Sequence, residues 1–245
     1  MSSPTILLPG DTIPPSLLPS PASTKPLTLG PGLRHIPPST ITAALSGPLH
    51  TDPRKNALWI ENNGGRYIPV AGDLVICAMH HSSVDAYHCS ITPYTAPATL
   101  PQLAFEGASK KTRPVLAPGA LVYARVSVAG KHMEPELECV HPGTGKAEGL
   151  GPLKGGMVWD VSLGMARRLL LPQGKMREVG GLVLLEALAE KVRFEIAVGR
   201  NGRVWVDGGD VKVTLAVGRA VVETDEGGLG VEEQRKLVAR VLRGL

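Results

Sequence analysis

The middle of the chain alternates between hydrophobic and polar positions with a period of two. One face of the segment 121–128 carries Val122, Ala124, Val126 and Val128. Successive side chains of a strand point to opposite faces, so this pattern predicts a half-buried strand. Other strand-like runs cover residues 73–79, 85–91 and 136–140. Around five short strands in roughly 75 residues predict a barrel of the oligonucleotide-binding type over residues 67–148.

From residue 149 onward the pattern becomes mixed. A strand is expected over residues 157–163, then two helices that end at Pro172 and near Glu190, then a hairpin over residues 194–207. Two further helices are marked by Val213, Ala216, Val217 and Ala220, and by Leu237, Val238, Val241, Leu242 and Leu245. This order of elements, with its terminal helix, predicts a KH domain of the type I order over residues 149–245.

The first 66 residues are rich in Pro, Gly, Ser and Thr. Short apolar runs lie at residues 5–8, 27–29 and 57–60, and the last ends at the turn-forming stretch Asn62-Asn63-Gly64-Gly65. We interpret residues 1–66 as a small N-terminal β domain, with a partly disordered arm as the alternative. The fold class is therefore multidomain, β plus α/β, with an oligonucleotide-binding barrel of the S1 type followed by a KH domain.

Composition narrows the possible partners. The 245 residues carry a formal net charge of +4, which is compatible with an RNA partner without proving one. The three cysteines form no CxxC motif, so we expect no disulfide framework, no metal site and no other cofactor, in a reducing compartment. No secretory signal and no apolar stretch of membrane-spanning length is visible, so no membrane partner is expected.

The stretch Gly199-Arg200-Asn201-Gly202 raises a specific question. KH domains clamp an RNA backbone with a Gly-x-x-Gly loop, but a type I order places that loop between the first two helices. Residues 171–177 occupy this place, and their single glycine is Gly174. Asn-Gly between two strands is typical of a tight hairpin turn. We therefore expect a structural turn here, with direct RNA contact as the alternative.

Four motifs occur together in order: "PGLR", "LAFEGASKKTRP", "GKHMEPELEC" and "GRNGRVWV". With them the chain resembles the ribosomal RNA-processing protein 40 family (exosome component 3), cap subunits of the eukaryotic RNA exosome. The related ribosomal RNA-processing protein 4 shares the architecture and is an alternative, but "FEGASKKTRP" and "MEPE" favour the first family. The resemblance covers nearly the whole chain.

The resemblance implies a non-catalytic, RNA-binding cap subunit rather than an enzyme. Such proteins sit with other cap subunits on a ring of phosphorolytic-nuclease-like subunits, and guide single-stranded RNA towards a 3′-to-5′ exonuclease. They take part in ribosomal RNA processing and RNA decay in nucleus, nucleolus and cytoplasm. In this family the Gly-x-Asn-Gly turn is structural, so Gly199, Asn201, Gly202 and the neighbouring Trp205 are expected at a junction between KH domain and barrel.

Candidate RNA contacts lie in the barrel. Lys110, Lys111 and Arg113 form a basic cluster in a loop, where cations would bind phosphates, although such runs are often only solvated. Tyr87 or His88 is a candidate for stacking on a base. The group His80, His81, Asp85 and His88 lacks the spacing of a metal or hydrolase site. A nuclease is disfavoured because no clustered carboxylates suit two-metal chemistry, whereas a free-standing RNA-binding regulator stays open.

Overall fold

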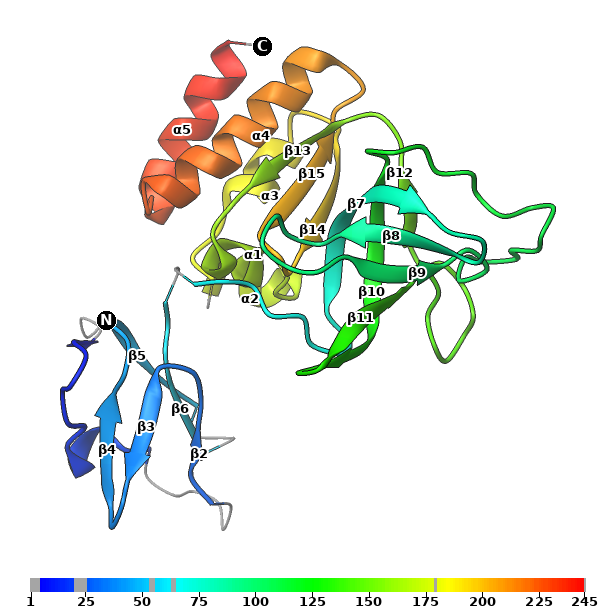
Figure 1. Ribbon diagram of the computed structural model, residues 1–245. Helices are drawn as coiled ribbons and strands as arrows, with labels where there is room; N and C mark the ends of the chain where they lie inside the picture. The colour runs from blue at the N-terminus through cyan, green and yellow to red at the C-terminus, as the bar shows by residue number, and fades with distance from the viewer. Residues whose placement is uncertain (1–4, 20–25, 53–55, 63–64, 179, 245) are drawn as a thin grey trace. The chain divides into compact units, whose positions relative to one another are not determined.

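The computed structural model describes residues 5–19, 26–52, 56–62, 65–178 and 180–244. The chain divides into two compact units, residues 1–65 and residues 66–245 (Figure 1). No helix in the described ranges is both long enough and apolar enough to cross a membrane.

The first unit is all β in its described part. Its strands are β1 (Ile6–Leu7), β2 (Thr28–Leu29), β3 (Leu33–Ile36), β4 (Thr40–Ala43), β5 (Gly47–Asp52) and β6 (Ala57–Ile60), with one 3-10 turn at Pro15–Leu17. A four-stranded sheet has the order β1-β5-β6-β2, and β3 pairs with β4. The three predicted apolar runs form β1, β2 and β6, whereas Asn63 and Gly64 of the predicted turn lie outside the described residues.

The "PGLR" motif of this unit has a local structural reason. Gly32 has φ +82°, and a Cβ placed on it would lie 2.8 Å from Cβ of Ile60. Ile60 belongs to the core of the unit, together with Leu7, Ile13, Ile41 and Ala43. A residue with a side chain at position 32 would therefore be strained and would push on this small core.

The second unit begins with the barrel. Its strands are β7 (Leu74–Ser82), β8 (Ala86–Ser90), β9 (Ala98–Pro101), β10 (Leu121–Gly130), β11 (Met133–Glu138) and β12 (Gly151–Leu153). The sheet order is β11-β9-β8-β7-β10-β12, and pairing of β10 with β11 closes the barrel. All pairs are antiparallel except β9 with β11. This is the predicted barrel with one additional short strand, β12.

The alternation that predicted β10 holds for most of the strand. Val122, Ala124 and Val126 are fully buried in the barrel core. Val128, expected on the same face, is 38% exposed, and that part of the prediction is wrong. The pairing of β10 with β11 shifts register between Val126 and Val128, so the regular alternation ends there.

The KH domain follows. It consists of β13 (Met157–Asp160), α1 (Leu163–Leu169), α2 (Gln173–Glu178), α3 (Leu184–Ala189), β14 (Glu195–Gly199), β15 (Arg203–Asp207), α4 (Val211–Glu226) and α5 (Val231–Arg243). The antiparallel sheet has the order β13-β15-β14. Val204 and Val206 of β15 pack with the helices, whereas Trp205 between them packs with Ile76 of the barrel. The sheet thus lies between the KH helices and the barrel (Figure 1).

Three helices, rather than the predicted two, separate β13 from β14. The stretch 171–177, expected to be a loop, is largely occupied by α2. Pro172 does end α1, but its carbonyl also accepts hydrogen bonds from the N–H groups of Lys175 and Met176, at 2.8 and 3.0 Å. Proline is well tolerated at the start of a helix, so the residue that stops one helix also opens the next. Leu245, expected in the last helix, lies outside the described residues.

One buried polar side chain ties α5 to the rest of the KH domain. Gln234 is fully buried, and its amide accepts a hydrogen bond from the N–H of Val183 at 2.9 Å. It also donates to the carbonyls of Gly181 and Leu229, both at 2.8 Å. All three partners are backbone groups, so Gln234 fixes the turn before α3 against the start of α5.

Replacing Gln234 by alanine should therefore destabilise the protein strongly. Each buried partner left without a hydrogen bond costs about 1–3 kcal/mol, so we expect a loss of about 3 kcal/mol or more in the free energy of unfolding. Urea unfolding followed by circular dichroism measures the change. The exposed neighbour variant Arg235→Ala is the control and should stay within about 0.5 kcal/mol of wild type. Equal stabilities of the two variants would contradict this role of Gln234.

Candidate nucleic-acid interface and domain junction

The side chain of Asn201 forms the centre of the junction between KH domain and barrel. Its Oδ1 accepts a hydrogen bond from the N–H of Ile76 at 3.2 Å. Its Nδ2 donates to the carbonyls of Ile76 and Ile91, at 2.9 and 2.8 Å. Ile76 lies in β7 and Ile91 directly follows β8, so one amide from the KH hairpin joins two segments of the barrel.

The residues around Asn201 allow this close approach. A Cβ on Gly199 would lie 2.7 Å from the backbone nitrogen of Ile76, so only glycine fits there. Gly202 has φ +77°, as a tight hairpin turn requires, and its carbonyl accepts the N–H of Val161 at 2.7 Å. The N–H of Arg200 donates to the carbonyl of Leu74 at 2.6 Å. Gly199, Arg200 and Asn201 thus meet the barrel directly, whereas Gly202 shapes the turn and ties it to Val161 within the KH domain.

Apolar and aromatic side chains complete the junction. Trp205, Ala197 and Ile76 form a buried cluster, against which Leu121, Tyr123, Leu153 and Val158 pack. The indole nitrogen of Trp205 donates to the carbonyl of Gly155 at 3.0 Å, and the hydroxyl of Tyr123 donates to the carbonyl of Val198 at 3.1 Å. Burial raises the pKa of Tyr123 to about 12.

This geometry answers the question raised by the motif. Asn201 is only 7% exposed, and its amide has backbone partners inside the protein. An RNA backbone cannot reach it without separating the two domains. The short connection between α1 and α2, residues 170–172, contains no glycine, so it does not supply a Gly-x-x-Gly clamp either.

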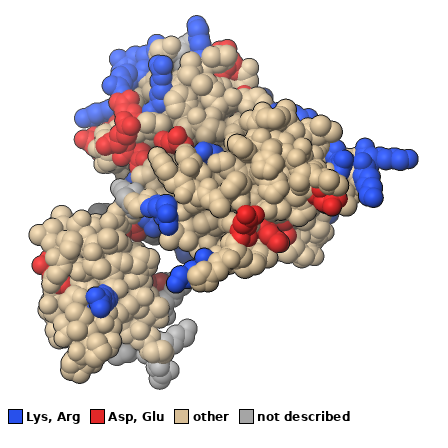
Figure 2. Space-filling view, in the orientation of Figure 1, with Lys and Arg blue, Asp and Glu red and all other residues tan. Residues whose placement is uncertain are grey.

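The predicted basic cluster lies in the loop of residues 102–120, between β9 and β10. Lys110 and Lys111 are exposed, and blue side chains project from this end of the barrel at the right of Figure 2. The loop has its own internal structure. Thr112 Oγ1 accepts from the N–H of Ser109 at 2.9 Å and donates to the carbonyl of Gly107 at 3.1 Å. The two lysines are therefore held on an ordered turn.

Arg113 occupies a different position from the lysines. It is half buried, and its guanidinium donates to the side-chain carbonyl of Gln102. Gln102 in turn donates from Nε2 to the carbonyl of Ser83, at 2.9 Å, in the turn between β7 and β8. Arg113 thus braces the loop against the neighbouring hairpin, which leaves Lys110 and Lys111 as the exposed cations of the predicted cluster.

The stacking role predicted for Tyr87 is wrong. Tyr87 is 4% exposed and belongs to the barrel core, so neither face of its ring is open to a base. Adjacent residues of a strand point to opposite faces, and here position 87 points inward and position 88 outward. The hydroxyl of Tyr87 donates to the carbonyl of Pro114 at 2.6 Å, so this residue anchors the basic loop from inside.

His88 lies on the outer face of the barrel within a group of three histidines. Its ring stacks on that of His81, with centroids 4.4 Å apart and planes inclined by 13°. Nδ1 of His80 lies 3.0 Å from Nδ1 of His81. The register of β7 and β8 shifts between Met79 and His81, and this irregularity leaves both His80 and His81 exposed. The group offers flat surfaces on which a base can stack.

Sequence reasoning missed one exposed ring. Tyr94 lies between β8 and β9 and is 82% exposed, in a protein whose described barrel aromatics Tyr67, Tyr87 and Phe105 are buried. The available signal was its position between Pro93 and Pro97, because turn segments of this kind lie on the surface. The loop that carries it starts at Ile91, whose carbonyl accepts a hydrogen bond from Asn201.

No described group of three or more His, Cys, Asp or Glu residues is arranged to hold a metal ion. The three cysteines are buried free thiols, and burial raises the pKa of Cys139 to about 12. A thiol of this kind is a poor nucleophile at neutral pH.

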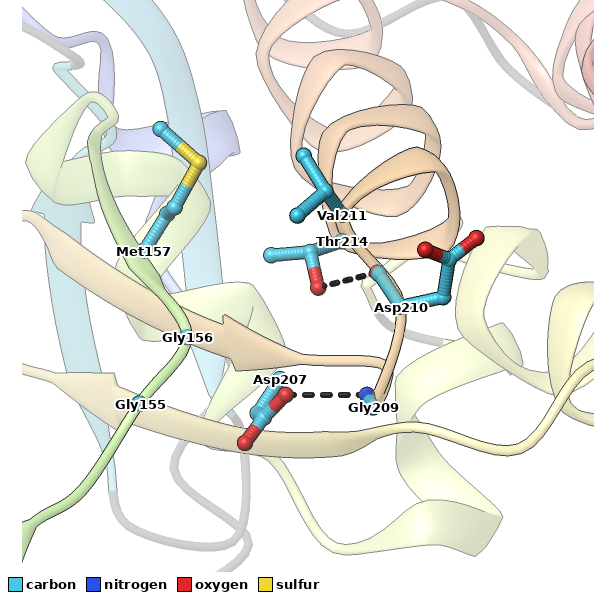
Figure 3. A pocket seen from close by; sticks show the side chains of 8 residues that line it. All are labelled: Gly155, Gly156, Met157, Asp207, Gly209, Asp210, Val211 and Thr214. Carbon is cyan, nitrogen blue, oxygen red and sulfur yellow. Dashed lines mark hydrogen bonds between the residues drawn. The ribbon is translucent and has the colours of Figure 1, made fainter.

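The glycine-rich stretch before β13 lines a pocket of about 320 Å³ at the start of α4 (Figure 3). The carboxylate of Asp207 lies beside Gly155, whereas the side chain of Asp210 points away from the glycines (Figure 3). The carboxylate of Asp207 accepts the N–H of Gly209 at 2.9 Å. A carboxylate at the glycines repels a phosphate, so Asp207 argues against a phosphate-binding loop here.

Comparisons with known proteins agree in order along the chain. Models described as "Exosome complex exonuclease Rrp40 N-terminal domain", "Exosome complex component RRP40, S1 domain" and "KH domain" match residues 27–66, 67–151 and 156–212. A β domain, an S1 barrel and a KH domain in this order define the class of exosome components that carry RNA-binding domains.

Relatives specify the family within that class. "Exosome complex component RRP40" of Drosophila melanogaster is 40% identical over 91% of this chain and 90% of its own. The protein of the same name from Saccharomyces cerevisiae is 36% identical over 89% and 88%. The chain therefore belongs to the family of exosome complex component RRP40. A solved structure titled "Crystal structure of putative exosome complex RNA-binding protein" shares the fold, with a TM-score of 0.57, 23% identity, and coverage of 73% of this chain and 97% of that one.

Replacing Asn201 by aspartate tests the junction. The new carboxylate would face the carbonyls of Ile76 and Ile91, which now accept hydrogen bonds from the amide. With two buried acceptors unpaired and a repulsive charge added, we expect a loss of about 3 kcal/mol or more in stability. Urea unfolding followed by tryptophan fluorescence measures it. Ser82→Asp, an exposed position, adds the same charge and should change stability by less than about 0.5 kcal/mol. If Asn201→Asp unfolds at the same urea concentration as the wild type, the hydrogen bonds of Asn201 do not stabilise the junction.

The raised pKa of Tyr123 predicts that the stability of the junction falls at alkaline pH. Its pKa rises from 10.0 to about 12 on folding, so the stability that this group contributes is complete below pH 10 and is lost as the pH rises through 12. Tyr123→Phe lacks this ionisation. The difference in unfolding free energy between wild type and Tyr123→Phe should therefore shrink over this pH interval. A difference that stays constant would show that Tyr123 titrates normally.

Proposed function

We propose that this chain is a non-catalytic RNA-binding cap subunit of the eukaryotic RNA exosome. The observation that carries the proposal is the rigid joint between two RNA-binding folds, made by the buried Asn201, with exposed cations at the outer end of the barrel. Membership in the family of exosome complex component RRP40 supports the proposal that the assembly is the exosome. Ring subunits of the phosphorolytic-nuclease-like type, other cap subunits and a 3′-to-5′ exonuclease are its proposed partners.

The proposed mechanism is electrostatic and geometric. Lys110 and Lys111 attract the RNA backbone without regard to sequence, because phosphates are the same in every strand. His81 and His88 offer a ring pair on which a base can stack, and Tyr94 a further ring. A single strand exposes its bases to such rings, whereas a duplex does not. The subunit thereby stabilises the ring and guides single strands into the channel towards the exonuclease.

A non-catalytic role fits the distribution of carboxylates. Two-metal nucleases hold their ions with clustered Asp and Glu side chains. In the described part of the chain no such cluster is present, and the carboxylates of Glu134, Glu136 and Glu138 follow one strand, β11. We propose that the protein acts in ribosomal RNA processing and RNA decay, in nucleus, nucleolus and cytoplasm. The competing function is a free-standing RNA-binding regulator, which would bind RNA tightly on its own.

The assembly is tested by purification of the tagged chain from its native cell at moderate salt. Ring subunits and an exonuclease recovered in equal amounts support the cap role. Recovery of the chain alone, together with tight RNA binding by the isolated protein, would support the free-standing regulator instead.

Charge reversal of both lysines tests RNA capture. Lys110→Glu combined with Lys111→Glu should weaken RNA binding by the assembled complex and leave assembly intact, because both side chains are exposed. Two lost phosphate contacts should lower the slope of log affinity against log salt by about 1.4 for a single strand. Fluorescence anisotropy with a labelled oligouridylate at several salt concentrations measures both quantities.

The control for this charge reversal is Lys191→Glu with Lys236→Glu, two exposed lysines of the KH domain. This control makes the same change in net charge at positions far from residues 102–120 in the sequence. If both double variants weaken RNA binding equally, the loop has no specific role. If the loop variant keeps wild-type affinity and salt slope, the RNA assignment of Lys110 and Lys111 is wrong.

A further inference from the structure

A groove runs between the last two helices of the KH domain. It has a volume of about 580 Å³ and is lined by Lys212, Leu215, Ala216, Arg219, Ala220, Glu223, Arg240, Val241 and Gly244. The match to the KH model ends at residue 212, at the start of α4, so almost all of this surface lies beyond the matched domain. Lys and Arg side chains gather over this part of the molecule, at the top of Figure 2, next to a group of Asp and Glu side chains.

The floor of the groove is apolar. Leu215 and Ala216 of α4 and Val241 of α5 are half buried, so each keeps part of its surface open to solvent. The neighbouring positions Val217 and Val221 point the other way, into the KH core. Small side chains at Ala216 and Ala220 keep the two helices from filling the space between them.

The rim of the groove is cationic. Lys212 and Arg219 are exposed, and neither has an ion-pair partner among the described residues. The carboxylate of Glu223 accepts a hydrogen bond from Arg240, so the acidic residue of the groove is already neutralised. Lys212 and Arg219 are seven residues apart, about two helical turns or about 10.5 Å along the axis of α4.

We propose that this groove binds an acidic amphipathic helix of a partner protein. Two antiparallel helices with an open apolar seam are completed by a third helix that lays its own apolar side chains into the seam. The positive rim selects carboxylates, and a spacing of two turns matches Asp or Glu residues seven positions apart on the incoming helix. The proposal does not depend on RNA binding by the barrel.

A protein fits this surface better than RNA does. Sequence-tolerant RNA binding combines cations with aromatic rings on which bases stack. None of the residues that line the groove is aromatic, and its floor consists of aliphatic side chains. Aliphatic floors with charged rims are typical of helix-binding grooves.

The test uses the full chain and a synthetic 18-residue helical peptide. The peptide carries Leu at helical spacing on one face and Glu seven positions apart along its flank. A second peptide with every Glu replaced by Lys, and an oligouridylate, are the alternative probes. Binding is mapped by NMR shifts of backbone amides and measured by fluorescence anisotropy. We expect the acidic peptide alone to shift the amides of α4 and α5, with an affinity that falls as salt rises.

Two variants separate the groove from general charge effects. Lys212→Glu with Arg219→Glu should weaken peptide binding by about tenfold or more, because reversal turns attraction at the rim into repulsion. Leu215→Asp, which places a charge in the floor without touching the rim, should weaken it as well. The matched control, Lys131→Glu with Lys146→Glu, makes the same change in net charge at two exposed positions outside α4 and α5, and it should bind the peptide as the wild type does. All variants are checked for a wild-type circular dichroism spectrum.

Three results would overturn the proposal: absence of saturable peptide binding, equal loss of affinity in the groove and control variants, or shifts of α4 and α5 amides by the oligouridylate rather than by the acidic peptide. Because these readouts involve neither Lys110 nor Lys111, failure of the groove and failure of the RNA loop are distinguishable.

Discussion

One amide side chain determines how the two RNA-binding folds of this protein act together. Asn201 carries both a donor and an acceptor, and it pairs with the backbone of Ile76 and Ile91 where the KH hairpin meets the barrel. A buried polar group is tolerable only when its hydrogen bonds are made, so this contact fixes a single docking geometry. Trp205 and the small Gly199 lie around it and depend on the same approach distance. A loop motif that clamps RNA in other KH domains is therefore used here to hold two domains together.

The basic loop depends on the barrel in a comparable way. Tyr87 holds Pro114 from inside the barrel, and Arg113 with Gln102 holds the loop against the β7–β8 turn from outside. These two anchors fix the base of the loop. The tip of the loop, with Lys110 and Lys111, stays exposed. The cations are thus presented at a defined place at the end of the barrel, which is what a guiding role requires.

Much of this architecture could be predicted from the sequence, because it follows from local periodicity. Alternation along β10 indicated correctly that Val122 and Ala124 share a buried face, and the Asn-Gly pair indicated a hairpin. The predictions were wrong where a contact between residues far apart in the sequence determines the local structure. A period of two shows that the side chains of Tyr87 and His88 point to opposite faces of the strand, but not which of them points inward. The hydroxyl of Tyr87 bonds to Pro114, which is 27 residues away in the sequence. Likewise Pro172 marks a helix end in sequence, whereas only the structure shows that α2 begins there.

If the basic loop binds RNA as proposed, its ordered state also affects the thermodynamics of that binding. A flexible lysine loop would lose conformational freedom together with the RNA on binding. Here the turn around Ser109 and Thr112 is already hydrogen-bonded, so most of the entropy loss falls on the RNA strand. Single strands that are already stiff, such as stacked purine runs, lose less conformational entropy on binding than flexible strands do. We therefore expect such a rim to rank single strands by their stiffness rather than by the identity of their bases.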